Sequence, residues 1–232
     1  MMKLADEFIQ KYNELDDWLR KQAGANREVP FSQAVSIVAQ KNRAVKSSEY
    51  FLKSIGNLRN AIIHDTKFGK RIIATPDQSV VKEFNDVCSR IFAPKKAIDI
   101  STRNIETFPL DINLSCVLPK MSSNDYSQLV VEKEDGSFGM ITREGISRWV
   151  EKNMDDDVVS LKDVKLENIY QLEDNNSWEF ISTKHSIYDA AALFSQDTRR
   201  IQALIITENG RPKEKPLGIL TFWDISKALG HE

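Results

Sequence analysis

Apolar residues in the first part of the chain recur at every third or fourth position, which is the spacing of amphipathic helices. This spacing predicts four helices: residues 2–22, a stretch capped by Ser32, a stretch from Ser47 or Ser48, and a stretch from about Asp77. Residues 67–76 are expected to form a loop or a short extended segment. Four short helices in succession are typical of a small bundle. We therefore predict an N-terminal α-helical bundle at residues 1–96.

From Ala97 onward, short apolar runs alternate with helical stretches, which is the pattern of an α/β unit. One order of elements occurs twice: an apolar run, a turn, a second apolar run that contains a glycine, and a helix. The two glycines, Gly139 and Gly218, are 79 positions apart. Such an internal repeat predicts a fold of two similar halves.

The repeat also predicts the individual elements of residues 97–232. The first copy, about 97–153, is expected to contain a helix at 114–121, strands at 128–132 and 138–142, and a helix to about 152. The second copy, about 154–232, begins with a connector at 153–179 and continues with 180–183, a helix at 186–195, strands at 201–207 and 217–221, and a last helix. Each copy alone leaves an apolar sheet face uncovered, so the two copies are expected to pack together. The predicted fold class is therefore α+β, with two domains.

Composition places the chain among soluble proteins. Its apolar content of 41% and charged content of 28% are ordinary. No apolar run approaches the roughly 20 residues that span a bilayer, and no signal-peptide pattern is seen, so we expect no membrane and a cytoplasmic location. Cys88 and Cys116 fall in different predicted domains without metal-ligand spacing, so no metal site is expected.

The net charge of −2 is unevenly distributed. Residues 1–97 carry a net charge of +6, and residues 98–232 carry −8. A basic half joined to an acidic half is consistent with an N-terminal domain that meets a polyanion such as RNA. The simpler interpretation, which we favour, is that these charged side chains only face water on the helix surfaces and bind no partner.

The run from Gly218 to Asp224 reads Gly-hydrophobic-hydrophobic-Thr-x-x-Asp. It resembles the most specific part of the cystathionine-β-synthase (CBS) domain, and the resemblance covers about residues 98–232. CBS domains work as tandem pairs, which usually bind adenosine-type nucleotides in clefts between the copies. The resemblance implies that Thr221 contacts phosphate or ribose and that Asp224 binds the ribose hydroxyls. A helix capping box, which needs no ligand, also explains this pair of residues.

The first copy departs from the family pattern. It has Thr142, but Gly145 stands where the ribose-binding aspartate is expected. We therefore expect one fully equipped nucleotide site rather than two. Four further residues are candidates for ligand contact: Ser182 and Thr183, which resemble positions that line the cleft, and Arg199 and Arg200, whose charge can neutralise phosphate.

Arg59, Asn60 and His64 lie close together near the end of the third predicted helix. This stretch resembles the Arg-Asn-x-x-x-His motif of the HEPN family, whose small helical bundles usually dimerise and in many cases cleave RNA without a metal. Histidine transfers protons near neutral pH, and arginine stabilises the charge of a phosphorane. Five steps along a helix turn through about 500°, so the side chains of Arg59 and His64 would diverge by about 140° within one chain. They would cooperate more readily across a dimer.

Two simpler interpretations of this stretch stay open. Many HEPN bundles do no chemistry and serve to dimerise or to bind nucleotides. In the purely structural interpretation, Arg59 pairs with a carboxylate such as Asp65 or Glu49, and His64 merely ends the helix.

Together, the resemblances imply a regulatory protein. Its CBS pair senses an adenine nucleotide (AMP, ADP, ATP or a related compound) and controls a homodimeric HEPN-like domain, with no cofactor for catalysis. One alternative is a nucleotide-regulated, metal-independent endoribonuclease that uses Arg59 and His64, with RNA as the partner of the helical domain. A second alternative is a structural dimerisation module without a ligand.

Overall fold

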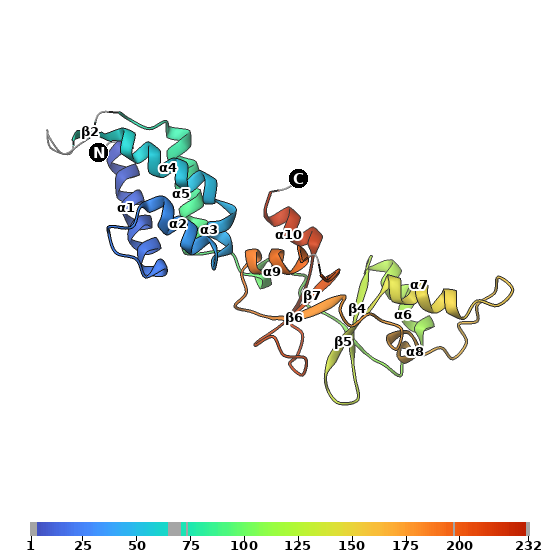
Figure 1. Ribbon diagram of the computed structural model, residues 1–232. Coiled ribbons are helices and arrows are strands. Elements are labelled where there is room, and N and C mark those ends of the chain that lie inside the picture. Colours follow the sequence, from blue (N-terminus) through green and yellow to red (C-terminus); the bar gives the residue numbers. More distant parts are fainter. Residues whose placement is uncertain (1–3, 65–70, 73, 197, 231–232) are drawn as a thin grey trace. The chain divides into compact units, whose positions relative to one another are not determined.

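The computed structural model describes residues 4–64, 71–72, 74–196 and 198–230. The chain divides into two compact units, Met1–Lys95 and Lys96–Glu232 (Figure 1). Each unit has its own buried apolar residues and is described by itself. Within the described residues, no helix is both long enough and apolar enough to cross a bilayer.

The N-terminal unit consists mainly of helices. They are α1 (Leu4–Ala23), α2 (Phe31–Ala39), α3 (Arg43–Ser47), α4 (Glu49–Ile62) and α5 (Gln78–Phe92). The short strands β1 (Ile63–His64) and β2 (Arg71–Ile72) pair in antiparallel fashion. The predicted apolar stripes form the core, in which the rings of Phe8 and Phe84 lie 5.4 Å apart between centroids. The bundle that the helical spacing predicts is therefore present.

Two details of the N-terminal prediction need correction. The second helix begins at Phe31, and its N-cap is Pro30 rather than Ser32, because the Pro30 carbonyl accepts bonds from the Gln33 and Ala34 amides at 3.0 Å each. The third predicted helix is preceded by α3, whose N-cap Asn42 accepts a bond from the Val45 amide at 3.0 Å. The predicted loop at 67–76 lies partly outside the described residues.

The C-terminal unit contains two three-stranded sheets with the same topology. The first half comprises the 3₁₀ turn η1 (Ala97–Asp99), β3 (Thr107–Pro109), α6 (Leu114–Ser123), β4 (Gln128–Glu132), β5 (Phe138–Thr142) and α7 (Arg143–Lys152). The second half comprises α8 (Leu166–Tyr170), β6 (Trp178–Ser182), α9 (Ile187–Phe194), β7 (Ala203–Thr207), β8 (Gly218–Thr221) and α10 (Phe222–Ala228). In each sheet the middle strand runs parallel to the strand before it and antiparallel to the strand after it. The internal repeat is therefore confirmed.

Two elements of this unit were missed by the sequence pattern. The region expected to be a connector contains α8 and the start of β6, and β3 was not predicted at all. Both β3 and α8 are short, with three and five residues, so neither displays a full period of its characteristic spacing.

The alternation of side chains along β4 explains how the two halves pack. Leu129 and Val131 face a core formed with α6, α7 and α8 on one side of the first sheet. Val130 points the other way, because successive residues of a strand point to opposite faces. It packs in a second core with Ala203 and Ile205 of the second sheet. The two sheets thus meet face to face, as the apolar pattern predicts.

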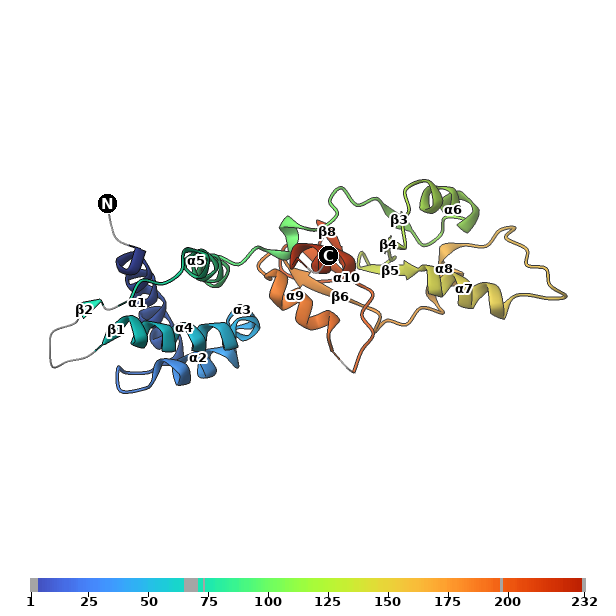
Figure 2. The same cartoon turned by 90° about the horizontal axis from the view of Figure 1, so that it is seen from above.

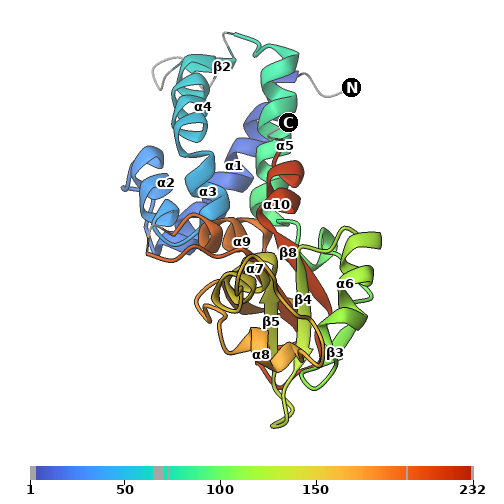
Figure 3. The same cartoon turned by 90° about the vertical axis from the view of Figure 1, so that its right-hand side faces the viewer.

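The views agree with this layering. Figure 1 shows α9 and α10 on the outer side of the second sheet, and α6, α7 and α8 on the outer side of the first. Figure 2 shows the same order from above. In Figure 3, which looks from the side of the first half, α7 and α8 lie in front of the strands. The C-terminal unit therefore has four layers: helices, sheet, sheet, helices.

Candidate functional site

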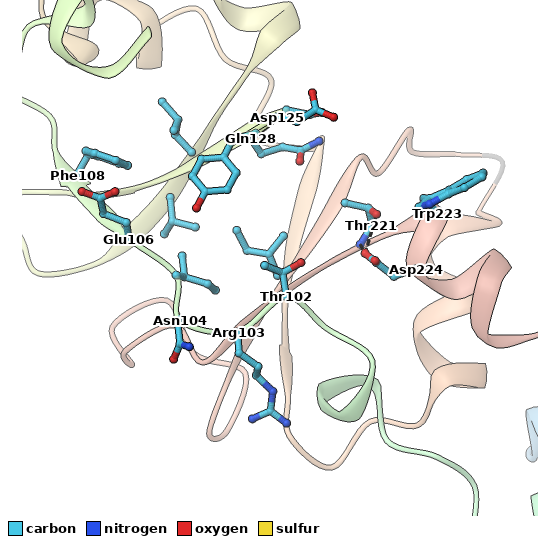
Figure 4. Close-up of a pocket in the computed structure, with 16 residues that line it drawn as sticks. Thr102, Arg103, Asn104, Glu106, Phe108, Asp125, Gln128, Thr221, Trp223 and Asp224 are labelled. Carbon is cyan, nitrogen blue, oxygen red and sulfur yellow. Dashed lines mark hydrogen bonds between the residues drawn. The ribbon is translucent and has the colours of Figure 1, made fainter. Parts of the chain in front are cut away.

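A pocket lies between the two halves of the C-terminal unit (Figure 4). It has a volume of about 350 Å³, near the lower end of the roughly 300–1,000 Å³ typical of small-molecule sites. The residues that line it come from three places: 102–106 and Phe108 before and within β3, 125–130 at the start of β4, and Ile219, Thr221, Trp223 and Asp224 at the end of β8 and the start of α10. Both halves therefore contribute to this pocket.

The first wall is held in place by β8. Thr102 and Ile219 exchange two backbone hydrogen bonds, with N···O distances of 2.9 and 3.0 Å. Gly218 permits this approach, because a Cβ atom at that position would lie 2.3 Å from the Ser101 hydroxyl oxygen. The glycine of the second repeat thus brings residues 102–106 of the first half into the pocket.

Thr221 and Asp224 form the opposite wall. The carboxylate oxygen Oδ2 of Asp224 accepts bonds from the Thr221 amide at 2.8 Å and from the Thr221 hydroxyl at 2.7 Å. This is the capping interaction that the spacing predicts. An ionised carboxylate offers about four acceptor positions, so Asp224 keeps acceptor capacity for hydroxyl donors in the pocket.

The pocket also offers aromatic surface. Trp223 is 76% exposed, and Phe108 lies across the pocket from it (Figure 4). Tyr126 also belongs to the lining. The adjacent Phe222 points elsewhere, because its ring packs edge-on against Phe194 at 6.2 Å between centroids. Of the two aromatic residues at the start of α10, only Trp223 is placed to contact a ligand.

The corresponding position in the first half is filled by the chain itself. Glu173, which follows α8, accepts a bond from the Thr142 amide at 2.7 Å and lies 3.1 Å from the Thr142 hydroxyl oxygen. A Cβ atom on Gly145 would lie 1.7 Å from Oε1 of Glu173. The Glu173 carboxylate therefore occupies the space that an aspartate side chain at position 145 would need.

The environment of Glu173 is that of a buried structural carboxylate. Its side chain is fully buried, and Oε2 lies 3.4 Å from Nη2 of Arg148. Burial raises the pKa of Glu173, while the hydrogen bonds from Thr142 and the charge of Arg148 oppose that shift. The Glu173 carboxylate thus lies beside Thr142, and the expectation of one fully equipped nucleotide site stays a prediction.

Comparison with known proteins gives the family of this unit. Residues 97–152 and 178–231 each match the CBS domain family. The C-terminal unit is a pair of CBS domains. The family matches lie outside the helical unit, whose HEPN-like identity stays a prediction.

Solved structures with similar folds include CBS proteins from two microorganisms. A conserved CBS domain protein of Thermoplasma acidophilum has a TM-score of 0.45 and 15% identity, over 58% of this chain and 68% of that one. A CBS-domain-containing protein of Agrobacterium tumefaciens has a TM-score of 0.44 and 18% identity, over 57% of this chain and 90% of that one. CBSX2, solved in complex with AMP, has a TM-score of 0.43 and 14% identity, over 58% of this chain and 96% of that one. No curated protein matches the chain.

Two predicted ligand contacts lie at the other end of the second CBS sheet. Ala203 of β7 pairs with Thr221, whereas Ser182 pairs with Thr207 at the far end of the same strand. Four residue steps of about 3.3 Å separate these positions, or about 13 Å. The Ser182 hydroxyl oxygen lies 2.9 Å from Nδ1 of His185, and the Thr183 hydroxyl donates to the Glu208 carbonyl at 3.2 Å. The structure does not bring Ser182 and Thr183 to the Thr221 pocket.

The paired arginines of the second CBS domain are also outside this pocket. Arg199 donates to Glu179 at 2.8 Å and to the Trp178 carbonyl at 3.3 Å. Arg200 is exposed, and neither arginine lines the pocket. The sequence pattern missed Thr102, Arg103 and the residues around Asp125, since they reach Thr221 only through the packing of the two CBS domains.

In the helical unit, Arg59 is held by its neighbours. Its Nη1 donates to Oδ1 of Asn60 at 3.2 Å, and its guanidinium lies 5.7 Å from the centre of the Tyr12 ring. Burial raises the pKa of the Tyr12 hydroxyl to about 12. The side chain that faces Arg59 is therefore a neutral phenol at neutral pH. The alternative in which Glu49 pairs with Arg59 is wrong, because Glu49 bonds Lys46 and Lys53 instead.

His64 departs from the predicted helix. The helix α4 ends at Ile62, and the backbone of His64 belongs to β1, opposite Arg71. The argument that Arg59 and His64 diverge along one helix therefore does not apply. The His64 side chain and Asp65 lie outside the described part of the structure. Among the described residues, no group of three or more His, Cys, Asp or Glu side chains is suited to hold a metal ion.

Proposed function

We propose that this protein is a regulatory adenosine-ligand sensor. Its CBS pair binds an adenine nucleotide or nucleoside in the pocket that contains Thr221 and Asp224 and thereby controls the N-terminal helical unit. The observation that carries the proposal is that one pocket joins the family's Thr-x-x-Asp residues to a wall from the other CBS domain. The adenosine part of the ligand follows from the resemblance to the CBS family.

Each wall has a part in binding. Asp224 accepts the ribose hydroxyls, since its carboxylate keeps acceptor positions beyond those used by Thr221. Trp223 and Tyr126 offer ring faces to the base. Residues 102–106 close the pocket from the first CBS domain.

Regulation follows from the position of the pocket between two domains. A ligand that contacts both walls favours the arrangement in which they are correctly spaced, and it shifts the population toward that arrangement. We propose that the change reaches the HEPN-like helical unit in a cytoplasmic homodimer. Hydrogen exchange of the helical unit, measured with and without ligand, reports this coupling directly.

Calorimetry on the full chain tests the binding site. Replacement Asp224→Ala removes hydrogen bonds to a charged group, which are worth about 1.5–3 kcal/mol each. We expect the affinity for adenosine or its nucleotides to fall by about tenfold to a hundredfold.

The matched control is Asp189→Ala. Asp189 caps α9 through the Ser186 amide at 2.9 Å and the Ser186 hydroxyl at 2.7 Å, the same arrangement as Asp224 with Thr221, but it does not line the pocket. Loss of a helix cap is therefore common to both variants. Equal loss of affinity in both would contradict the proposed site, and the absence of heat with every adenosine compound would favour the structural module.

An endoribonuclease is the second candidate for the helical unit, with RNA as substrate. The adjacent placement of Arg59 and Asn60 near the end of α4, where Asn60 is three residues before the start of β1, favours it. The groove beside this end of the helix is acidic, with Asp6, Glu14 and Asp17 of α1 next to Ile63, and it would repel a polyanion. Metal-free cleavage of RNA that disappears in both Arg59→Ala and His64→Ala would establish the activity. Equal cleavage by wild type and His64→Ala would exclude this mechanism.

A further inference from the structure

The walls of the Thr221 pocket are rich in carboxylates. Glu106, Asp125 and Asp224 line it from three separate segments. Among the lining residues, all of which are described, the single lysine or arginine is Arg103. Figure 4 shows the Arg103 side chain extending away from Thr221 and Asp224. No guanidinium or ammonium group of the lining is therefore directed at the ribose-binding pair.

Two further cations lie behind the lining rather than in it. Lys120 pairs with Glu106, and Nη2 of Arg143 lies 2.9 Å from Oδ1 of Asp125. Both pairs are substantially exposed, so water and salt screen them. They reduce the negative potential of the pocket, but they do not supply a positive group that faces a ligand.

Two groups that could hold a phosphate are bonded to carboxylates instead. The Thr221 amide, a backbone donor at the start of α10, bonds the Asp224 carboxylate. Arg199, the half-buried arginine of the second CBS domain, is bonded to Glu179. A phosphate placed beside Thr221 and Asp224 would meet carboxylates without an arginine or lysine side chain of the lining directed at it to offset the repulsion.

We propose that the ligand of this pocket is an adenine nucleoside whose 5′ substituent is uncharged or positively charged, rather than a 5′-phosphate. The proposal rests on the proposed function and specifies the ligand class of the same site. Asp224 holds the ribose hydroxyls, and Glu106 and Asp125 select against negative charge. A cationic 5′ group gains from the same carboxylates that repel phosphate.

A charge series on one base and sugar tests the proposal. Adenosine, 5′-amino-5′-deoxyadenosine, AMP and ATP are titrated into the full-length protein by calorimetry, without divalent cations and at low ionic strength, where the screening length exceeds about 10 Å. We expect AMP to bind at least about tenfold more weakly than adenosine, ATP more weakly still, and the amino compound at least as tightly as adenosine. Added salt should reduce the differences in affinity among the four compounds, because it screens the charges.

The variant Asp125→Asn tests the contribution of one carboxylate charge of the pocket. Asp125 is an exposed residue with φ of 51°, a backbone conformation that asparagine tolerates, so the fold is preserved. We expect the ratio of adenosine to AMP affinity to fall by about twofold to fivefold in this variant. The control Asp157→Asn, at an exposed connector residue with φ of 62°, should leave the ratio unchanged.

The outcomes separate this inference from the proposed function. Binding of AMP or ATP as tightly as adenosine would overturn the inference and leave the nucleotide sensor intact. An equal change of the ratio in Asp125→Asn and Asp157→Asn would also overturn it. Failure of every adenosine compound to bind would overturn both proposals.

Discussion

At the residue scale, Glu173 takes in the first CBS domain the place that Asp224 has in the second. It takes the hydrogen bonds of Thr142 that correspond to those of Thr221 in the second domain, where Asp224 accepts them. Gly145 is small because the Glu173 carboxylate lies against its backbone. Gly145 and Glu173 of the first domain thus together take the place that the single residue Asp224 has in the second.

The pair Gly145 and Glu173 supports a double-mutant prediction. Gly145→Asp alone should lower the free energy of unfolding by at least about 1–3 kcal/mol, the usual cost of overpacking, because its Cβ would clash with Glu173. Glu173→Ala removes the clashing atoms, and the new carboxylate can then cap α7. Urea unfolding of the two single variants and the double variant gives the coupling energy, which should be favourable to the double variant.

Binding stoichiometry gives an independent measurement on the same variants. The double variant has a Thr-x-x-Asp sequence in both CBS domains and an emptied first crevice, so calorimetry should find two ligand sites per chain instead of one. Purely additive destabilisation, or a stoichiometry that remains one, would show that Glu173 is not what closes the first site.

The candidate site was predictable only where it is contiguous. Thr221 and Asp224 belong to one short stretch, and their spacing alone indicates a capped helix beside a strand end. Thr102 and Asp125 come from other segments, and no local pattern marks them as neighbours of Thr221. Ser182 lies at a strand end like Thr221, but the parallel pairing of β6 with β7 carries it to the opposite end of the sheet. The positions of Ser182 and Thr221 relative to each other are set by the pairing of β6 and β8 with β7, which the sequence alone does not show.

At the scale of elements, the long apolar runs determined what could be predicted. The bounds of β4, β5 and α7 agree with the predicted 128–132, 138–142 and a helix to about 152, because turns and a threonine cap delimit them sharply. Short elements such as β3 and α8 lack enough residues to show a period. They owe their conformation to the sheet and the core on which they pack.

The contact between β8 and the segment at Ser101 supports a second prediction. In Gly218→Ala, the added methyl group would meet the Ser101 hydroxyl oxygen at 2.3 Å and push residues 101–102 away from β8. We expect a loss of about 1–3 kcal/mol in unfolding free energy and weaker ligand binding, because the displaced segment forms one wall of the pocket. Urea unfolding and calorimetry measure the two effects.

A companion variant tests the cause of that loss. Ser101→Ala removes the oxygen but keeps the Cβ, which would lie 3.1 Å from the new methyl group. It should therefore restore part of the stability and part of the affinity in the Gly218→Ala background. If Ser101→Ala has no effect there, the glycine is required for a reason other than this contact.

At the scale of the whole molecule, the chain consists of two units with separate buried cores. A ligand that binds only the folded CBS pair stabilises that unit by about 2.7 kcal/mol at a free concentration one hundred times its Kd. For a unit of this size, the corresponding rise in melting temperature is several degrees. Whether the helical unit shares that rise depends on whether the two units are thermodynamically coupled.

Calorimetric melting of the full chain therefore tests the regulatory proposal. If the ligand controls the helical unit, adenosine should raise the CBS transition and also change hydrogen exchange or melting in α1 to α5, because coupling between sites is a free energy that both must register. Asp224→Ala should remove both effects, and Asp189→Ala should retain both. A ligand-induced rise confined to the CBS transition, with unchanged exchange in the helical unit, would mean that the pair binds its ligand without controlling the bundle.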